Sequence, residues 1–337
     1  MLLIYTGSYP NDKCGVGDYV YNLGVELSKY TQCKIIKLSL LSLLKLMILN
    51  RGKIELLNIQ YPSIGFATSK FSAIRPHLAF LIAKTLGLKT SITLHEFSSL
   101  SAKAKKFTQI FMMADFVIFT TEYEKQVGEK YYFSKEKTRL IPIASNIPTS
   151  ATSLKHKVTE FDIVHFGIIS EGKGIEDFIW VLNELNSRGV QFKAALIGYI
   201  PETQERFAKE ILHQCSLQNC TTLLNQSSED IAEYLSKSNF AILPYPDGIS
   251  ERRGSALAAM ANGALVFSFK GRFSAEFSNI SVLAQDKNDL LEKVLNYLDN
   301  RHLYEGMIER AFSYSETRNW SFIAQKYKGL YSDDSDK

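Results

Sequence analysis

Two adjacent arginines stand at the start of a helix-prone segment in the second half of the chain. The segment Pro244–Gly263 (PYPDGISERRGSALAAMANG) follows the apolar run Phe240–Leu243, and Arg252 and Arg253 fall at its strand-to-helix turn. A helix start presents free backbone N–H groups and the positive end of the helix dipole, and guanidinium groups bind phosphate oxygens in pairs. The segment therefore predicts a phosphate or diphosphate site. A solvated turn that merely carries two arginines is the alternative from this segment alone.

A second turn of this kind follows the first apolar run of the second half. Phe166 and Gly167 end that run, and Gly172, Lys173 and Gly174 precede a helical pattern. Lys173 therefore stands where a strand gives way to a helix, unless it is simply a surface lysine in a glycine-rich turn. Open α/β sheets bind ligands at the carboxyl ends of their strands. Lys173 and the two arginines together favour an anion site at one sheet edge.

The first half of the chain contributes a glycine turn and a histidine. Gly15 and Gly17, in CGVGDY, precede a helix expected over Tyr19–Lys29, and glycine lets a backbone pass close to a ligand. The spacing is not GxGxxG, and no acidic residue ends the second strand suitably, so a dinucleotide cofactor is disfavoured. His95, in TLHE, closes a strand, and Glu96 beside it could orient the ring in a cleft. A histidine hydrogen-bonded inside the domain is the alternative.

The elements that would position these residues are predicted from the apolar pattern, in which strand-like runs and helical patterns alternate along the whole chain. The strand-like runs are continuously apolar, which is typical of parallel sheets buried on both faces. We expect strands at Leu2–Thr6, Lys34–Leu38, Glu55–Gln60, Ser91–His95, Phe116–Thr120 and Arg139–Ile143, and at Asp162–Phe166, Lys193–Ile197, Cys220–Leu224, Phe240–Leu243, Leu265–Phe269 and Ser281–Leu283. Helical patterns separate them. This rhythm predicts an α/β protein with two doubly wound parallel sheets.

The sequence also predicts where the domains meet. A polar stretch, Asn146–Glu160, contains Pro148 and has no apolar period, so it marks a break. We expect a Rossmann-like domain over residues 1–150, a second over 151–310, and a C-terminal helix over 311–330 that packs back toward the first domain.

Composition limits the class of protein. Hydrophobic residues make up 45% and charged residues 22% of the chain, as in soluble globular proteins. The four cysteines form no CxxC and the six histidines no HxxxH, so we expect no metal and no disulfide framework, and a cytoplasmic location. Residues 1–150 carry 19 Lys and Arg against 10 Asp and Glu. This surplus predicts an anionic surface or ligand for the first half, with ordinary solubilising lysines as the alternative.

The order of these motifs resembles glycosyltransferase family 4, whose members are retaining nucleotide-sugar glycosyltransferases of the GT-B fold. The matching pieces are PxxxxGVGDYVxxL from Pro10, TLHE, the turn at 166–174, LIGY at 196–199, PYPDGISERRGSALAAMANGALV from Pro244 and the helix around Trp320. They cover nearly the whole chain. The resemblance implies two Rossmann-like domains that face each other across a cleft.

The resemblance also implies roles for the matching residues. His95, Lys173, Arg252 and Arg253 would be catalytic, with His95 on the transferred sugar and the three cations on the diphosphate. Further donor or nucleotide contacts would come from Gly15, Gly17, Gly167, Gly198, Tyr199, Gly254 and Ser255, and further sugar contacts from Asp247, Gly248, Ser250 and Glu251. No metal and no cofactor beside the nucleotide-sugar donor is implied.

The sequence departs from the family pattern at three positions. Ile168 stands where many members carry an arginine, and Ser250 and Ala258 stand where many carry two glutamates with seven residues between them. Glu251 lies one residue away from the first of these. The ERRGS variant resembles a subgroup found in bacterial polysaccharide gene sets, in which Arg252 or Arg253 would supply the missing diphosphate charge.

The expected function is metal-independent, retaining transfer of a hexose from a nucleoside diphosphate, most simply UDP, to a glycan or lipid-linked acceptor in bacterial surface polysaccharide assembly. The apolar run Leu38–Leu49 and the basic helix Ala102–Met113 could bring the first domain to the inner face of an anionic plasma membrane. A helix packed on the sheet is the alternative for Leu38–Leu49. A non-catalytic GT-B subunit that binds a nucleotide or glycan, and another GT-B enzyme such as an epimerase, are the competing functions. Nucleic acid is not an expected partner.

Overall fold

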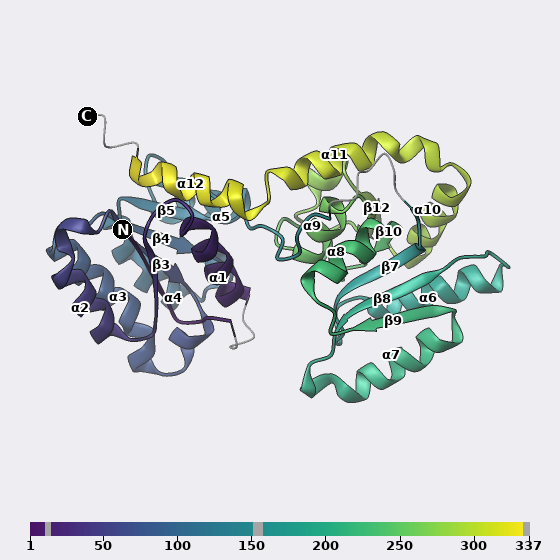
Figure 1. Ribbon diagram of the computed structural model, residues 1–337, viewed down its shortest axis with the longest axis horizontal. Helices are drawn as coiled ribbons and strands as arrows, with labels where there is room; N and C mark the ends of the chain where they lie inside the picture. The colour runs from purple at the N-terminus through teal and green to yellow at the C-terminus, as the bar shows by residue number, and fades with distance from the viewer. Residues whose placement is uncertain (11–14, 151–157, 333–337) are drawn as a thin grey trace. The chain divides into compact units, whose positions relative to one another are not determined.

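The computed structural model describes residues 1–10, 15–150 and 158–332. It consists of two compact units (Figure 1). The first unit comprises Met1–Ala144 and the chain from Asn319 onward, and the second comprises Ser145–Arg318. The chain thus changes unit at 144–145 and at 318–319, whereas the sequence placed these changes at 150–151 and 310–311. Residues 151–157 of the predicted break lie outside the described residues.

The first unit is built on a six-stranded parallel sheet of order β2-β1-β3-β4-β5-β6. Its strands are β1 (Leu2–Thr6), β2 (Cys33–Lys37), β3 (Leu56–Tyr61), β4 (Thr90–Leu94), β5 (Phe116–Phe119) and β6 (Thr138–Leu140). Its helices are α1 (Gly15–Leu27), α2 (Leu40–Leu49), α3 (Lys70–Thr85), α4 (Ala102–Thr108), α5 (Glu122–Tyr131) and α12 (Trp320–Ser332), with 3-10 turns η1 (Arg51–Lys53), η2 (Ile64–Ala67), η3 (Phe97–Ser99) and η4 (Gln109–Met113).

The second unit is a parallel sheet of the same size, in the order β12-β11-β10-β7-β8-β9. Its strands are β7 (Phe161–Ile168), β8 (Ala194–Tyr199), β9 (Cys220–Leu224), β10 (Ser238–Ile242), β11 (Leu265–Phe269) and β12 (Val282–Ala284). Its helices are α6 (Ile175–Ser187), α7 (Glu205–Leu217), α8 (Ser228–Ser236), α9 (Gly254–Ala261), α10 (Lys287–Asp299) and α11 (Glu305–Glu316), with 3-10 turns η6 (Glu202–Gln204), η7 (Ala275–Phe277) and η8 (Arg301–Tyr304).

The predicted α/β class with two parallel sheets is confirmed. Each predicted strand overlaps an observed one, and β1, β9 and β11 have the predicted bounds. The reason is visible in β1, where all five residues are buried. Leu3 and Tyr5 enter the core under α2 and α3, while Leu2 and Ile4 enter the core under α1 and α12. In a strand that is covered on both faces, successive side chains are all buried, so the strand is a continuous apolar run that can be recognised in the sequence.

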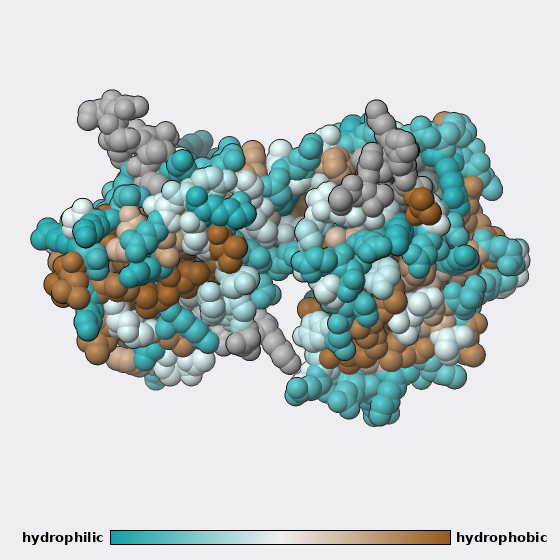
Figure 2. Space-filling model, viewed as in Figure 1, coloured by the Kyte–Doolittle hydropathy of each residue, from teal (hydrophilic) through white to brown (hydrophobic). Residues whose placement is uncertain are grey.

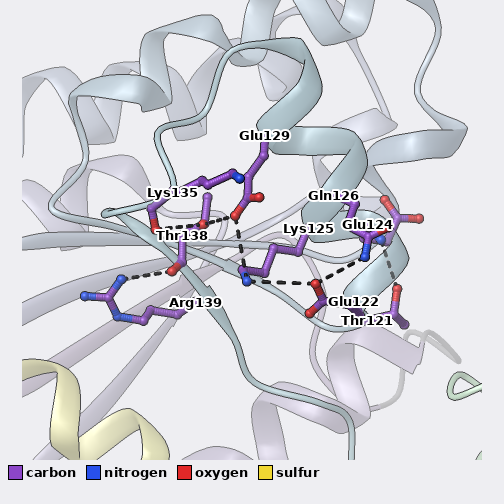
Figure 3. Close-up of polar contacts among 9 residues, drawn as sticks. All are labelled: Thr121, Glu122, Glu124, Lys125, Gln126, Glu129, Lys135, Thr138 and Arg139. Atoms are coloured by element: carbon purple, nitrogen blue, oxygen red, sulfur yellow. Dashed lines mark hydrogen bonds and ion pairs between the residues drawn. The ribbon is translucent and has the colours of Figure 1, made fainter.

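Polar contacts, in addition to hydrophobic packing, attach α5 to the edge of the first sheet. At α5, the Thr121 hydroxyl accepts a hydrogen bond from the Glu124 backbone N–H at 3.2 Å and caps the helix (Figure 3). Lys125 lies 3.8 Å from Glu129, whose carboxylate also accepts a hydrogen bond from the Thr138 hydroxyl at 2.5 Å. Glu129 therefore ties α5 to the edge strand β6.

The last helix belongs to the first unit, although more than 170 residues of the second unit precede it in the chain. α12 packs on α1 through Ile323, Ala324 and Tyr327, which are fully buried. None of the helices within the described ranges is both long enough and apolar enough to span a bilayer.

Candidate functional site

The predicted site residues fall into two groups, one in each unit. Gly15, Gly17 and His95 belong to the first unit, and the others belong to the second. The second group lies at the carboxyl ends of β7 and β8 and in the turns that follow β7 and β10, three neighbouring strands of one parallel sheet. Because the strands are parallel, their carboxyl ends share one edge, where open α/β sheets bind ligands.

The arginine-bearing turn connects β10 with α9. Arg253 is the N-terminal capping residue of α9, and its guanidinium carbon lies 4.5 Å from the centre of the Tyr245 ring. Its Nη2 donates a hydrogen bond to Asp247. The Tyr245 hydroxyl lies 2.6 Å from Ser255 Oγ in the first turn of α9. Burial raises the pKa of Tyr245 to about 12, so the phenol stays protonated and adds no negative charge beside Arg253, whose own charge is paired with Asp247.

Space is left open at the start of α9. A Cβ placed on Gly254 would meet no heavy atom within 4 Å, whereas the six residues that follow Ser255 are all buried. The helix is thus anchored along its length, while Gly254 and Ser255 at its start are only partly buried. This is the geometry that receives an anion at a helix start.

Glycines bring the neighbouring turns into contact. Gly174 has φ of +82°, and a Cβ there would lie 1.9 Å from the Pro244 carbonyl oxygen. The turn that carries the exposed Lys173 therefore lies directly against the turn that carries the arginines. On the other side, a Cβ on Gly198 would lie 2.0 Å from the Gly167 carbonyl oxygen, while the Cα of Gly167 faces open space. A side chain at 174 would push the two turns apart, and one at 198 would push apart the ends of β7 and β8.

Two cations at the same edge were missed in the sequence. Lys270 and Arg272 are exposed and follow β11, which pairs with β10. Their turn touches the arginine turn, because a Cβ on Gly248, where φ is +84°, would lie 2.3 Å from the Gly271 nitrogen. The sequence could have indicated them, because Lys270 comes directly after the predicted strand Leu265–Phe269, and Lys173 was found from its place in the turn after a strand.

Glu251 has a partner within the second unit. Its carboxylate lies 3.3 Å from Nη2 of Arg318, and both side chains are largely buried. The Arg318 guanidinium also packs on the Tyr314 ring at 4.4 Å and donates to its hydroxyl at 3.0 Å. This ion pair joins the arginine turn to the chain just beyond α11. The sugar contact predicted for Glu251 stays a prediction beside this structural role.

His95 follows β4 and is hydrogen-bonded inside the first unit. It is 8% exposed, and its Nε2 lies 2.7 Å from Oε1 of Gln60 on β3. The Gln60 amide N–H groups are directed to Asn58 Oδ1 and to Thr93 Oγ1, so its oxygen is the acceptor for the ring. His95 Nε2 therefore carries the proton. The His95 and Tyr19 rings meet nearly at right angles, with 5.0 Å between their centroids.

The hydrogen-bond network of His95 continues to the last helix. Thr93 Oγ1 accepts from Asn58 Nδ2 at 3.1 Å and from Gln60 Nε2 at 3.3 Å, so its own hydrogen is directed to the Tyr327 hydroxyl at 2.7 Å. The Tyr327 hydroxyl lies 3.1 Å from that of Tyr19. Burial raises the pKa of both tyrosines, so both hydroxyls keep their hydrogens.

The prediction of a glycine turn at residues 15–17 is wrong in its local structure. α1 begins at Gly15 instead of near Tyr19, so both glycines are helical. Gly17 is required because a Cβ there would lie 2.9 Å from the backbone of Tyr9, and Gly15 faces open space. Residues 11–14 of the motif lie outside the described residues. The donor contact predicted for the two glycines stays a prediction.

Solved structures share this architecture of two parallel α/β units. A glycosyltransferase from Rickettsia africae ESF-5 is 14% identical, with a TM-score of 0.73 and 98% of each chain covered. Anabaena Alr3699/HepE, in complex with UDP, is 14% identical, with a TM-score of 0.71 and 98% of this chain and 99% of that one covered. WaaG, a glycosyltransferase involved in lipopolysaccharide biosynthesis, is 10% identical, with a TM-score of 0.61 and coverage of 98% and 100%. These likenesses establish the GT-B fold.

The second unit carries the family assignment. A model of the family described as glycosyl transferases group 1 matches residues 146–314, just over half of the 337 residues. The chain belongs to this family of glycosyltransferases. The match includes all the basic turns of the second unit described above, and it includes no residue of the first unit. No curated protein matches the sequence closely enough to count as a relative.

Proposed function

We propose that the protein transfers a hexose from a nucleoside-diphosphate sugar, most simply a UDP-sugar, to a glycan or lipid-linked saccharide with retention at the anomeric carbon. The observation that carries the proposal is the set of cations beside the start of α9 at one edge of the second sheet, where Lys173 and Arg253 lie on touching turns. HepE was solved with UDP, with UDP-glucose, and with UDP and glucose, which supports this donor class.

The chemistry fits this set of residues. In the transfer, the bond between the anomeric carbon and the diphosphate oxygen breaks, and its electron pair leaves with the diphosphate. The acceptor hydroxyl forms the new bond to carbon and gives its proton to the departing phosphate oxygen. Positive charge develops on the sugar and negative charge on the leaving group. Lys173, Arg252 and Arg253 would stabilise that negative charge together with the N–H groups of α9, so the proposed reaction needs no metal and no further cofactor.

The two units would divide the work. The second unit would bind the nucleotide, with Gly198 and Tyr199 near the base and Gly254 and Ser255 at the phosphates. The first unit would bind the acceptor and present His95 to the transferred sugar. WaaG is involved in lipopolysaccharide biosynthesis, which supports a role in bacterial surface glycan assembly. In our proposal the protein works on the cytoplasmic side, with peripheral contact to the membrane.

Binding and turnover of the donor test this proposal. We expect UDP, in a panel with GDP and ADP, to raise the melting temperature of the protein, and the matching sugar conjugate to release UDP slowly. The variant R252A/R253A should lower turnover by roughly a hundredfold or more, because charge-stabilising groups at a leaving group contribute on that scale. R188A is the matched control, since Arg188 lies at the far end of α6 and pairs with Glu184.

A non-catalytic subunit is the competing function, motivated by Ser250 and Ala258 where many family members carry glutamates. Such a subunit would bind UDP yet release none from any sugar conjugate with any acceptor. Unchanged turnover in R252A/R253A would instead show that the leaving group is held elsewhere. If no nucleotide shifts the melting temperature, the donor site itself is excluded.

A further inference from the structure

α3 carries exposed hydrophobic side chains on the side away from its core. Phe80 is fully buried against the sheet. Phe71, Ile74, Leu78 and Leu81 are 65%, 49%, 37% and 38% exposed. Their spacing of three, four and three residues places them in one line along the helix. A helix of a soluble domain ordinarily shows polar residues on this side.

The neighbouring helix α2 repeats the pattern. Leu43 and Met47 are buried, while Leu41, Ile48 and Leu49 are 79%, 64% and 69% exposed. α2 packs directly on α3, so the two helices are neighbours on the first unit. Figure 2 shows hydrophobic side chains gathered over α2 and α3.

On its other flank α3 packs on η4, the continuation of α4. Phe107, Met112 and Met113 on these two segments are 59%, 43% and 49% exposed. Together α2, α3, α4 and η4 hold ten of the twenty large hydrophobic side chains that are exposed in the described part of the chain. We call the exposed side chains of these four segments the α2–η4 face. Apolar exposure on this scale marks an interaction surface.

The charges on the same segments all have one sign. The sequences of α2, α3, α4 and η4 contain seven Lys or Arg residues and no Asp or Glu. Lys45, Lys70, Lys103 and Lys106 are exposed, and Arg75 packs its guanidinium over the Phe71 ring at 5.0 Å. A second copy of the chain would bring the same cations against each other across a twofold interface. An anionic surface that also accepts apolar side chains complements both properties.

We propose that the α2–η4 face docks on an anionic lipid bilayer, with its hydrophobic side chains entering the interface and its lysines contacting the lipid phosphates. Aromatic and aliphatic side chains beside Lys and Arg are what a peripheral membrane helix requires, and binding then depends on both. The inference rests on the proposed function, whose lipid-linked acceptor would be presented at such a surface. Lipid binding needs neither donor nor acceptor, so the two proposals can fail separately.

Vesicle flotation of the full chain tests the proposal. We expect binding to phosphatidylglycerol–phosphatidylcholine vesicles at low salt, release at high salt, and little binding to phosphatidylcholine alone. The variant K45Q/K103Q/K106Q should lower the partition coefficient by roughly a hundredfold, because each basic residue near an anionic surface contributes about a factor of five. L41S/L49S/F71S should lower it comparably without loss of fold, since the three side chains are already exposed.

Matched controls come from the second unit. L217S/L303S removes side chains that are 60% and 68% exposed, and K193Q/K209Q removes two exposed lysines. Both controls should bind the anionic vesicles like the wild type. The proposal is overturned if the wild type does not float at low salt, or if the controls lose as much binding as the test variants. It is equally overturned if the face mediates self-association, seen as a wild-type dimer by light scattering that L41S/L49S/F71S abolishes.

Discussion

At the scale of single residues, the hydrogen bond between His95 and Gln60 fixes a tautomer. The Gln60 oxygen accepts from His95 Nε2 because both amide hydrogens of Gln60 are directed elsewhere. His95 Nδ1 is then the acceptor nitrogen of the ring. We therefore expect nitrogen-15 spectra of histidine-labelled protein to show the Nε2–H form of His95 at neutral pH.

The variant Q60E sharpens this prediction. It keeps an acceptor oxygen against the ring but adds a buried negative charge, which favours the imidazolium form and raises the pKa of His95 above its wild-type value. A titration of the His95 ring by NMR measures the change, with Q126E on the surface of α5 as the control. An Nδ1–H tautomer in the wild type, or an unchanged pKa in Q60E, would show that Gln60 does not hold this ring.

Residue identities at the strand ends could be predicted, but their partners could not. Lys173, Arg252 and Arg253 were found from the sequence because they stand in turns that lead from an apolar run into a helix, and parallel strands bring such turns to one edge. Gln60 lies 35 residues from His95, and Glu251 lies 67 residues from Arg318. No periodicity links such pairs. Their contacts follow from strand order and from packing of a distant segment, which a single sequence does not encode locally.

At the scale of elements, Gly174 joins two turns and can be tested by its backbone. In G174A the new methyl group would overlap the Pro244 carbonyl, and the residue would keep a φ of +82°. G189A is the matched control, because Gly189 has φ of +74° but no atom within 4 Å of a Cβ. The left-handed conformation alone costs roughly 1–2 kcal/mol with a side chain present. We expect G174A to lower the free energy of unfolding by more than G189A.

Donor binding separates the two glycine variants further. G174A should weaken UDP binding, since the turn that carries Lys173 must move away from the arginine turn, whereas G189A should bind UDP like the wild type. Urea unfolding and calorimetric titration measure the two effects. Equal losses of stability in both variants would mean that the contact between the turns contributes nothing.

The positions of the strands could be predicted from hydrophobicity, whereas the side of each helix that faces the sheet could not. A buried parallel strand such as β1 is apolar throughout, so it is recognised wherever it lies. In α2 and α3 the apolar residues occupy both the core side and the solvent side. The sequence therefore indicated helices there without indicating which side meets the sheet. For the same reason the run Leu38–Leu49 left packing and membrane contact open as alternatives.

At the scale of the whole molecule, the second unit begins at Ser145 and not after residue 150, because hydrogen bonds attach the connecting residues to it. The Ser145 N–H donates to the Arg318 carbonyl at 3.2 Å, and Asn262 accepts from the Ser150 N–H at 2.8 Å and donates to the Pro148 carbonyl at 3.1 Å. These bonds attach residues 145–150 to the second unit. The polar composition of this segment predicted a break between domains. It does not indicate which unit the segment is hydrogen-bonded to, because that depends on residues far away in the sequence.

The stability of the whole molecule should depend on pH through one buried histidine of the second unit. Burial lowers the pKa of His165 to about 4 from its ordinary 6.5, while the ring lies 2.9 Å from the Ile242 carbonyl through Nδ1. The folded state thus binds a proton less readily than the unfolded state. The stability that this neutral ring contributes is complete above pH 6.5 and is lost as pH falls toward 4, by about 3 kcal/mol in all.

Urea unfolding at a series of pH values between 7 and 4 measures this loss. H165N removes the titrating ring, so its unfolding free energy should fall less steeply with acid, even though the smaller side chain lowers stability at every pH. H302N is the control, because His302 is exposed on η8 and its removal leaves the second sheet untouched. Since His165 packs against Phe178 of α6, and α6 follows directly from the turn of Lys173, acid unfolding should also release bound UDP over the same pH range. Parallel pH profiles for the wild type and H165N would assign the acid sensitivity to other groups.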